Sequence, residues 1–129
     1  MDHKTDGSIF IPGNVPSSKN GKQWTGKYLV SSKSTQAWYK NSKDSMQSNK
    51  DSFLFWLKDL EAPYHVAFKF IRKSRHPFDY VNPLQTIQDA MVKHGWIEDD
   101  NADVIVPVLL PYEYDKEKPG VYISISRTN

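Results

Sequence analysis

Hydrophobic residues along the chain recur with two different periods, and each period predicts one kind of element. Period-two alternation predicts strands at 8–12, 64–72, 104–112 and 121–126. In the strand at 64–72, Val66, Phe68 and Phe70 fall on one face, which we expect to be buried. We expect the last two strands to form an antiparallel hairpin, with Pro107 making its first strand bulged or placing it at an edge.

Apolar positions spaced three and four residues apart predict two helical regions. The first begins near Gln36 and continues to an apolar cluster at 53–57, and its polar middle leaves open whether it is one helix or two. The second runs from about Pro83 to Lys93 and stops at Gly95. This order of elements predicts an α+β fold, in which a small mixed or antiparallel sheet of about four strands packs against two or three helices.

The chain has 129 residues, a length that predicts a single domain. Residues 1–7 are polar and predict a flexible N-terminus, so that the domain itself spans 8–129. The segment 14–34 is rich in Ser, Lys, Asn and Gly and predicts a long loop, either wholly irregular or containing a short hairpin around Gly26.

Composition excludes several classes of function. The sequence contains no cysteine, which excludes disulfides, zinc–thiolate sites and thiol nucleophiles. No apolar run approaches the roughly 18–20 residues of a membrane span, and the N-terminus lacks a signal-peptide core. We therefore expect a cytoplasmic protein that does not enter a membrane.

The basic residues are concentrated in two places although the formal net charge is only +2. Some lie in the loop that follows the first strand, and others lie just before Asp79. Such residues can hold the phosphates of a nucleic acid, or they can belong to an ordinary solvated surface of mixed charge. The candidates for phosphate contacts are Lys19, Lys22, Lys69, Arg72, Lys73 and Arg75.

Acidic residues surround the second predicted helix. Asp79 precedes the helix, Asp89 lies within it, and Asp99 and Asp100 follow it. Carboxylates drawn from segments that fold together are typical ligands of a divalent cation. Each acid also has an ordinary structural reading, since Asp79 can cap the helix and Asp99 and Asp100 can form a turn. For Asp89 that reading is a place on the solvated face of the helix.

The stretch 79–100 resembles the signature of the RusA-like Holliday-junction resolvases, which are small endonucleases common in phages and prophages. That signature is approximately D-x-D-N-x-x-K-x-x-x-D-A-L, followed by a glycine and then by D-D. The resemblance extends over almost the whole chain and includes the proline-containing basic loop that follows the first strand. The residues that match the signature are Asp79, Asn82, Asp89, Ala90, Gly95, Asp99 and Asp100.

The resemblance implies a magnesium site, with manganese as a substitute, but two positions depart from the family pattern. One of the family's acidic ligands corresponds to Val81, and its catalytic lysine corresponds to Gln85. The metal ligands and catalytic residues that the resemblance implies are Asp79 and Asp100. The oxygen missing at Val81 can come from Asn82, Asp89 or Asp99. We expect Asp79, Asp99 and Asp100 around the metal, with Asn82, Gln85 and Asp89 as supporting residues.

The function that the resemblance implies is resolution of four-way DNA junctions. A symmetric homodimer would grip the junction and nick two opposing strands, in recombination, repair or phage DNA processing. Two other hypotheses stay open. Because of the two departures, the chain can be a junction-binding protein without cleavage activity. Alternatively, it is an interaction module whose acidic cluster is only a turn.

Overall fold

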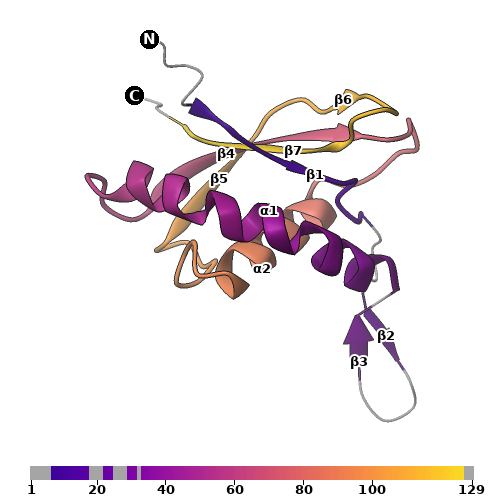
Figure 1. Cartoon of the computed structure of the whole chain (residues 1–129), viewed down its shortest axis with the longest axis horizontal. Coiled ribbons are helices and arrows are strands. Elements are labelled where there is room, and N and C mark those ends of the chain that lie inside the picture. Colours follow the sequence, from indigo (N-terminus) through magenta and orange to yellow (C-terminus); the bar gives the residue numbers. More distant parts are fainter. Residues whose placement is uncertain (1–6, 18–21, 25–28, 32, 127–129) are drawn as a thin grey trace.

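The computed structural model of the chain describes residues 7–17, 22–24, 29–31 and 33–126 (Figure 1). The predicted flexible N-terminus therefore lies, apart from Gly7, outside the described residues. The elements in chain order are β1 (Ile9–Pro12), β2 (Lys22–Trp24), β3 (Leu29–Ser31), α1 (Lys33–Leu57), β4 (Tyr64–Arg72), α2 (Val81–Lys93), β5 (Ile105–Leu109), β6 (Glu113–Tyr114) and β7 (Gly120–Ile125).

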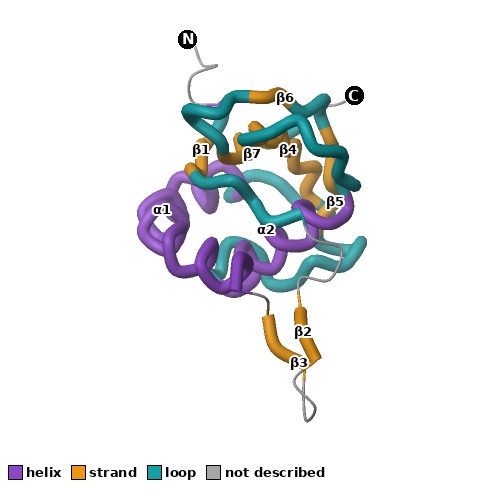
Figure 2. Tube along the Cα trace, turned by 90° about the vertical axis from the view of Figure 1, so that its right-hand side faces the viewer, coloured by secondary structure: helices purple, strands orange, loops and turns teal. Residues whose placement is uncertain are grey.

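The described residues form a five-stranded mixed sheet with two helices, which confirms the predicted α+β class. The strand order is β1-β7-β4-β5, and β6 also pairs with β4. Strand β4 is central, and Val66, Phe68 and Phe70 on it are completely buried, as predicted. Both helices lie on the same side of the sheet (Figures 1 and 2). The hydrophobic core therefore lies between the sheet and this helical layer.

The predicted hairpin between 104–112 and 121–126 is wrong. Strand β7 pairs antiparallel with β4, whereas β5 pairs parallel with β4 on its other side. The chain reaches β5 from β4 through α2, and a helical crossover of this kind is what a parallel pair requires. Pro107 does lie on an edge strand, as predicted, since β5 ends the strand order.

Of the two alternatives left open for 14–34, a separate two-stranded sheet supports the one with a short hairpin. Strands β2 and β3 pair antiparallel, with Lys22 opposite Ser31 and Trp24 opposite Leu29. Gly26 itself lies outside the described residues. This hairpin extends away from the main sheet and the two helices (Figures 1 and 2).

The first helical region is one continuous helix, and it begins three residues before the predicted start at Gln36. Its polar middle remains helical because a narrow buried stripe passes through it. The buried side chains of the stripe are Thr35, Trp38, Ser42, Met46, Phe53 and Leu57, spaced mostly three or four residues apart.

Among the described residues, no helix is both long enough and apolar enough to cross a bilayer.

Helix α2 begins two residues before the predicted Pro83 and ends as predicted at a glycine. Gly95 has a φ of 81°, a left-handed conformation that favours glycine. The amide of Gly95 donates to the carbonyl of Val92, and the amide of Trp96 donates to the carbonyl of Met91. This pair of bonds is a Schellman motif, which reverses the chain and directs the following loop back towards α1.

We expect Gly120→Ala to destabilise the fold by about 1–3 kcal/mol, because β1 leaves no space for a methyl group. A Cβ at Gly120 would lie 2.5 Å from both the Ile11 carbonyl oxygen and the Cζ of Phe10. Urea denaturation measures the change in the free energy of unfolding. Gly7→Ala is the matched control, since a Cβ there meets no atom within 4 Å. Equal stability of the two variants would contradict the close approach of β7 and β1.

Candidate functional site

The exposed face of α2 holds two carboxylates together through one amide. The Nε2 of Gln85 donates to Asp89 Oδ1 at 2.8 Å and to Asp100 Oδ2 at 3.1 Å. Gln85 and Asp89 are neighbours because they lie one helical turn apart. Asp100 reaches them because the turn at Gly95 directs the chain back along the helix. The structure therefore brings together three of the predicted site residues.

Tyr39 of α1 adds a phenol and an aromatic face to this cluster. Burial raises the pKa of Tyr39, and the negative charge of Asp89 raises this pKa further. The ammonium of Lys93 lies 5.6 Å from the centre of the Tyr39 ring. The phenol therefore stays protonated at neutral pH and can donate a hydrogen bond. No signal in the sequence connects Tyr39 with Asp89.

Asp99 is engaged in its own turn. Its Oδ1 accepts a hydrogen bond from the Asp100 amide at 2.7 Å, and its Oδ2 accepts one from the Asn101 side chain at 2.9 Å. Such local bonds are the ordinary use of aspartate in turns. They hold the loop in the shape that presents Asp100 to Gln85. The role of Asp99 as a metal ligand stays a prediction, and its contacts support the turn interpretation.

Asp79 stands exposed immediately before α2 and does not cap it. Tyr80 occupies the N-cap position, and no side-chain hydrogen bond closes that end of the helix. Among the described residues, no hydrogen bond or ion pair involves the Asp79 carboxylate. Val81, at the position of a family ligand, is 63% exposed although it is apolar. The Asp79 side chain therefore does not cap α2, which is the structural role that the sequence predicts for an aspartate at this position.

The described residues provide too few converging carboxylates to enclose a metal ion. Within the described part of the chain, no three His, Asp or Glu side chains converge closely enough to hold a cation. Asp89, Asp100 and the amide oxygen of Gln85 nevertheless provide oxygen donors of the kind that magnesium accepts. Magnesium usually keeps several waters and takes only one or two carboxylates from the protein. Two carboxylates are thus within the number that magnesium takes from a protein.

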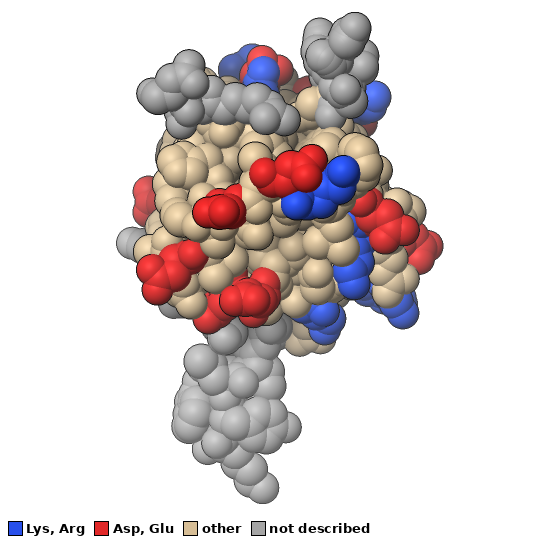
Figure 3. All heavy atoms as spheres, turned by 90° about the vertical axis from the view of Figure 1, so that its left-hand side faces the viewer, with Lys and Arg blue, Asp and Glu red and all other residues tan. Residues whose placement is uncertain are grey.

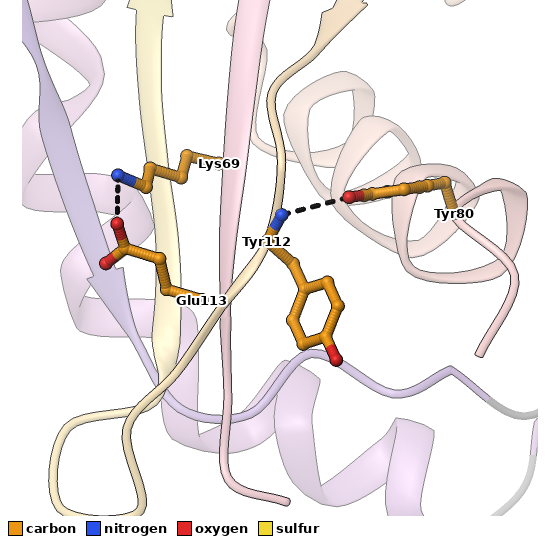
Figure 4. A network of polar contacts seen from close by, with 4 residues as sticks. All are labelled: Lys69, Tyr80, Tyr112 and Glu113. Atoms are coloured by element: carbon orange, nitrogen blue, oxygen red, sulfur yellow. Dashed lines mark hydrogen bonds and ion pairs between the residues drawn. The ribbon is translucent and has the colours of Figure 1, made fainter. Parts of the chain in front are cut away.

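Two of the predicted basic residues are paired on the surface. The ammonium of Lys69 lies 2.7 Å from a carboxylate oxygen of Glu113, on the neighbouring strand β6 (Figure 4). The guanidinium of Arg75 lies 4.3 Å from the centre of the Tyr114 ring. A stacked guanidinium still presents its edge to a phosphate, whereas the Lys69 ammonium is already neutralised.

Arg72 faces the interior and supports the loop that follows β1. Its side chain donates to the carbonyl of Val15 at 2.6 Å and to the hydroxyl of Ser17 at 2.8 Å. The guanidinium also lies 4.6 Å from the centre of the Phe78 ring. Burial lowers the pKa of Arg72, and Tyr112 acts in the opposite direction. This placement argues against a phosphate contact from Arg72.

The other predicted basic residues lie near the same loop. The amide of Lys73 donates to the side chain of Asn14, and the Lys73 side chain is exposed. Lys19 and the side chain of Lys22 lie outside the described residues. A phosphate contact from any of these three stays a prediction.

An aromatic group fixes the segment that carries Asp79. The phenol oxygen of Tyr80 accepts a hydrogen bond from the Tyr112 amide at 2.9 Å (Figure 4). The Phe78 ring packs edge-on against both tyrosines, at centre-to-centre distances of 5.3 Å and 5.1 Å. Asp79 therefore lies between two anchored residues, so that its backbone position is well defined although its side chain is exposed.

Comparison of the chain with protein-family models gave no match, and comparison with curated proteins gave none either.

Proposed function

We propose that the chain is a metal-dependent endonuclease that resolves four-way DNA junctions by paired nicks, acting as a homodimer in the cytoplasm. The proposal rests on the residue pattern of 79–100, which resembles the RusA-like resolvases, and on one structural observation. That observation is the shared amide of Gln85, which gathers Asp89 and Asp100 on an exposed surface. Asp79 lies two residues before the same helix begins, and Asn82 lies in its first turn.

The residues of this cluster would hold the cation at the scissile phosphate. Asp100 and Asp89 would supply carboxylates, and Gln85 would supply its amide oxygen after a rotation of the side chain. Asp79, which precedes the helix, has no hydrogen-bond or ion-pair partner among the described residues. A bound magnesium or manganese ion supplies positive charge at the phosphate and lowers the pKa of a water molecule. Lys73 and Arg75, both exposed, lie on the segment that leads to Asp79 and would steer the DNA backbone towards it.

A second candidate function is junction binding without cleavage. Val81 and Gln85 favour it, because an apolar side chain and a neutral amide stand where the family has a ligand and a lysine. The hydrogen bonds of Gln85 also satisfy two carboxylates without any cation. In this case Asp100→Asn would leave junction affinity unchanged or raise it, since it removes negative charge near the DNA.

Cleavage of a synthetic four-way junction tests the proposal. We expect the full chain to nick two opposing strands in the presence of magnesium or manganese, and to lose this activity when the metal is chelated. Linear duplex of the same sequence is the control substrate. Tight junction binding without nicking in either metal would establish the second candidate. Equal affinity for junction and duplex at moderate salt would exclude both candidate functions. The hypothesis that the chain is an interaction module would then remain.

A further inference from the structure

A solvent-accessible groove lies at the C-terminal end of α1, beside the loop that also carries Asp99 and Asp100, although neither aspartate lines it. Its volume is about 810 Å³, and it is lined by α1, by the start of β4 and by the loop that follows α2. Apolar side chains form its floor, including Leu57 and Trp96, which are almost completely buried. Leu54 at its edge is 38% exposed. The size suits the apolar side chains of a bound segment.

The edge of the groove is acidic. Glu98 and Asp103 line it and are exposed, and Glu61 lies beside the lining residues Leu60 and Ala62. Within the described part of the chain, none of these three carboxylates has an ion-pair partner. Figure 3 shows separate acidic groups around broad uncharged areas on the side of the molecule where α1 ends.

The basic residues at the groove do not balance this charge. The ammonium of Lys50 lies beside the lining residue Gly95, but it contributes one positive charge against the three carboxylates. Lys58 lines the groove, but its ammonium lies 3.6 Å from a carboxylate oxygen of Asp59 and 5.0 Å from the centre of the Phe55 ring. Phe55 is 66% exposed, so the end of α1 presents apolar surface outside the groove as well. An apolar floor with an unbalanced acidic edge is complementary to a ligand that is apolar on one side and cationic around it.

We propose that this groove binds a basic amphipathic segment of a partner protein. Two or three apolar side chains of the segment occupy the space above Leu57 and Trp96, and its Lys or Arg side chains pair with Glu98 and Asp103. Recognition of this kind places apolar anchors at a helical spacing in a groove, while charges at the edge set orientation and specificity. The groove lies outside the residues proposed for DNA cleavage, so this inference does not depend on the proposed function.

A fluorescent synthetic helix tests the proposal. The probe carries leucines at positions i, i+4 and i+7 and lysines at the positions that flank this apolar stripe, and its scrambled isomer has the same composition and charge. We expect the full chain to bind the patterned peptide at least about tenfold more tightly than the scrambled one, as measured by fluorescence anisotropy. Backbone amide shifts in NMR spectra should be confined to 54–64 and 95–104.

Two groove variants and one matched control separate the apolar and charged contributions. Leu54→Lys and the double variant Glu98→Lys with Asp103→Lys should each weaken binding of the patterned peptide by about tenfold or more. All three positions are exposed, so the fold should persist, which circular dichroism checks. Asp51→Lys is the control, because Asp51 is an exposed acid on α1 outside the groove lining.

Three outcomes would overturn the proposal. Equal affinity for the patterned and scrambled peptides would reduce the binding to general charge attraction. Unchanged affinity in both groove variants would place the binding elsewhere. Sedimentation equilibrium that shows a dimer of the wild type, converted to monomers by Leu54→Lys, would assign the groove to a second copy of the chain.

Discussion

Asp100→Asn is expected to reduce nicking of a four-way junction by more than about 100-fold, since even residues that only orient metal ligands typically contribute 10–100-fold. The carboxylate of Asp100 lies beside that of Asp89 and accepts from the same amide nitrogen. Asparagine keeps the size of the side chain and one oxygen but loses the negative charge that a cation needs. Single-turnover cleavage of a labelled junction, at saturating protein, measures the effect.

The binding of the junction separates a catalytic effect from a structural one. Asp100→Asn should retain junction affinity and thermal stability, because Asp100 lies at the surface and Gln85 can still meet an amide oxygen there. Asp51→Asn, an exposed acid on α1, serves as the control for the general effect of one lost charge. Wild-type rates in Asp100→Asn would exclude Asp100 from the site and remove the central residue of the proposal.

The local elements of the fold were predictable because their signals lie within short stretches of sequence. The alternation of Val66, Phe68 and Phe70 predicted β4, and the glycine at 95 predicted the end of α2. The pairing of the last strands was not predictable in the same way. Two alternating strands close in sequence favour a hairpin, but the buried run along β4 requires a neighbour on each side, and β5 and β7 supply them.

The candidate site was predictable only as a set of residues. Helical spacing alone places Gln85 beside Asp89. The contact with Asp100 depends on the Schellman turn and on the bonds of Asp99, which no sequence period encodes. Arg72 illustrates the same limit, since its partners lie more than fifty residues earlier in the chain. A cluster of basic residues in sequence therefore says little about which of them face solvent.

Trp96→Ala is expected to lower the free energy of unfolding by about 3–5 kcal/mol, the usual cost of removing a buried tryptophan. Trp96 is 1% exposed, and its ring stacks on Phe53 with 4.9 Å between the ring centres. Its indole nitrogen also donates to the Met46 carbonyl at 3.0 Å. Trp96 thus attaches the loop that carries Asp100 to the middle of α1. Urea denaturation followed by circular dichroism measures the loss.

Two further variants divide this effect into its parts. Trp96→Phe keeps most of the stacking and loses the hydrogen bond, so it should cost less than Trp96→Ala, with the bond itself contributing about 0.5–1.5 kcal/mol. Phe55→Ala is the matched control, because this ring is 66% exposed and its removal should change stability little. Similar losses for Trp96→Ala and Phe55→Ala would contradict the packing of the loop on α1. Because that packing also sets the position of Asp100, a loss of stability in Trp96→Phe should be accompanied by weaker cleavage, whereas Phe55→Ala should leave both properties intact.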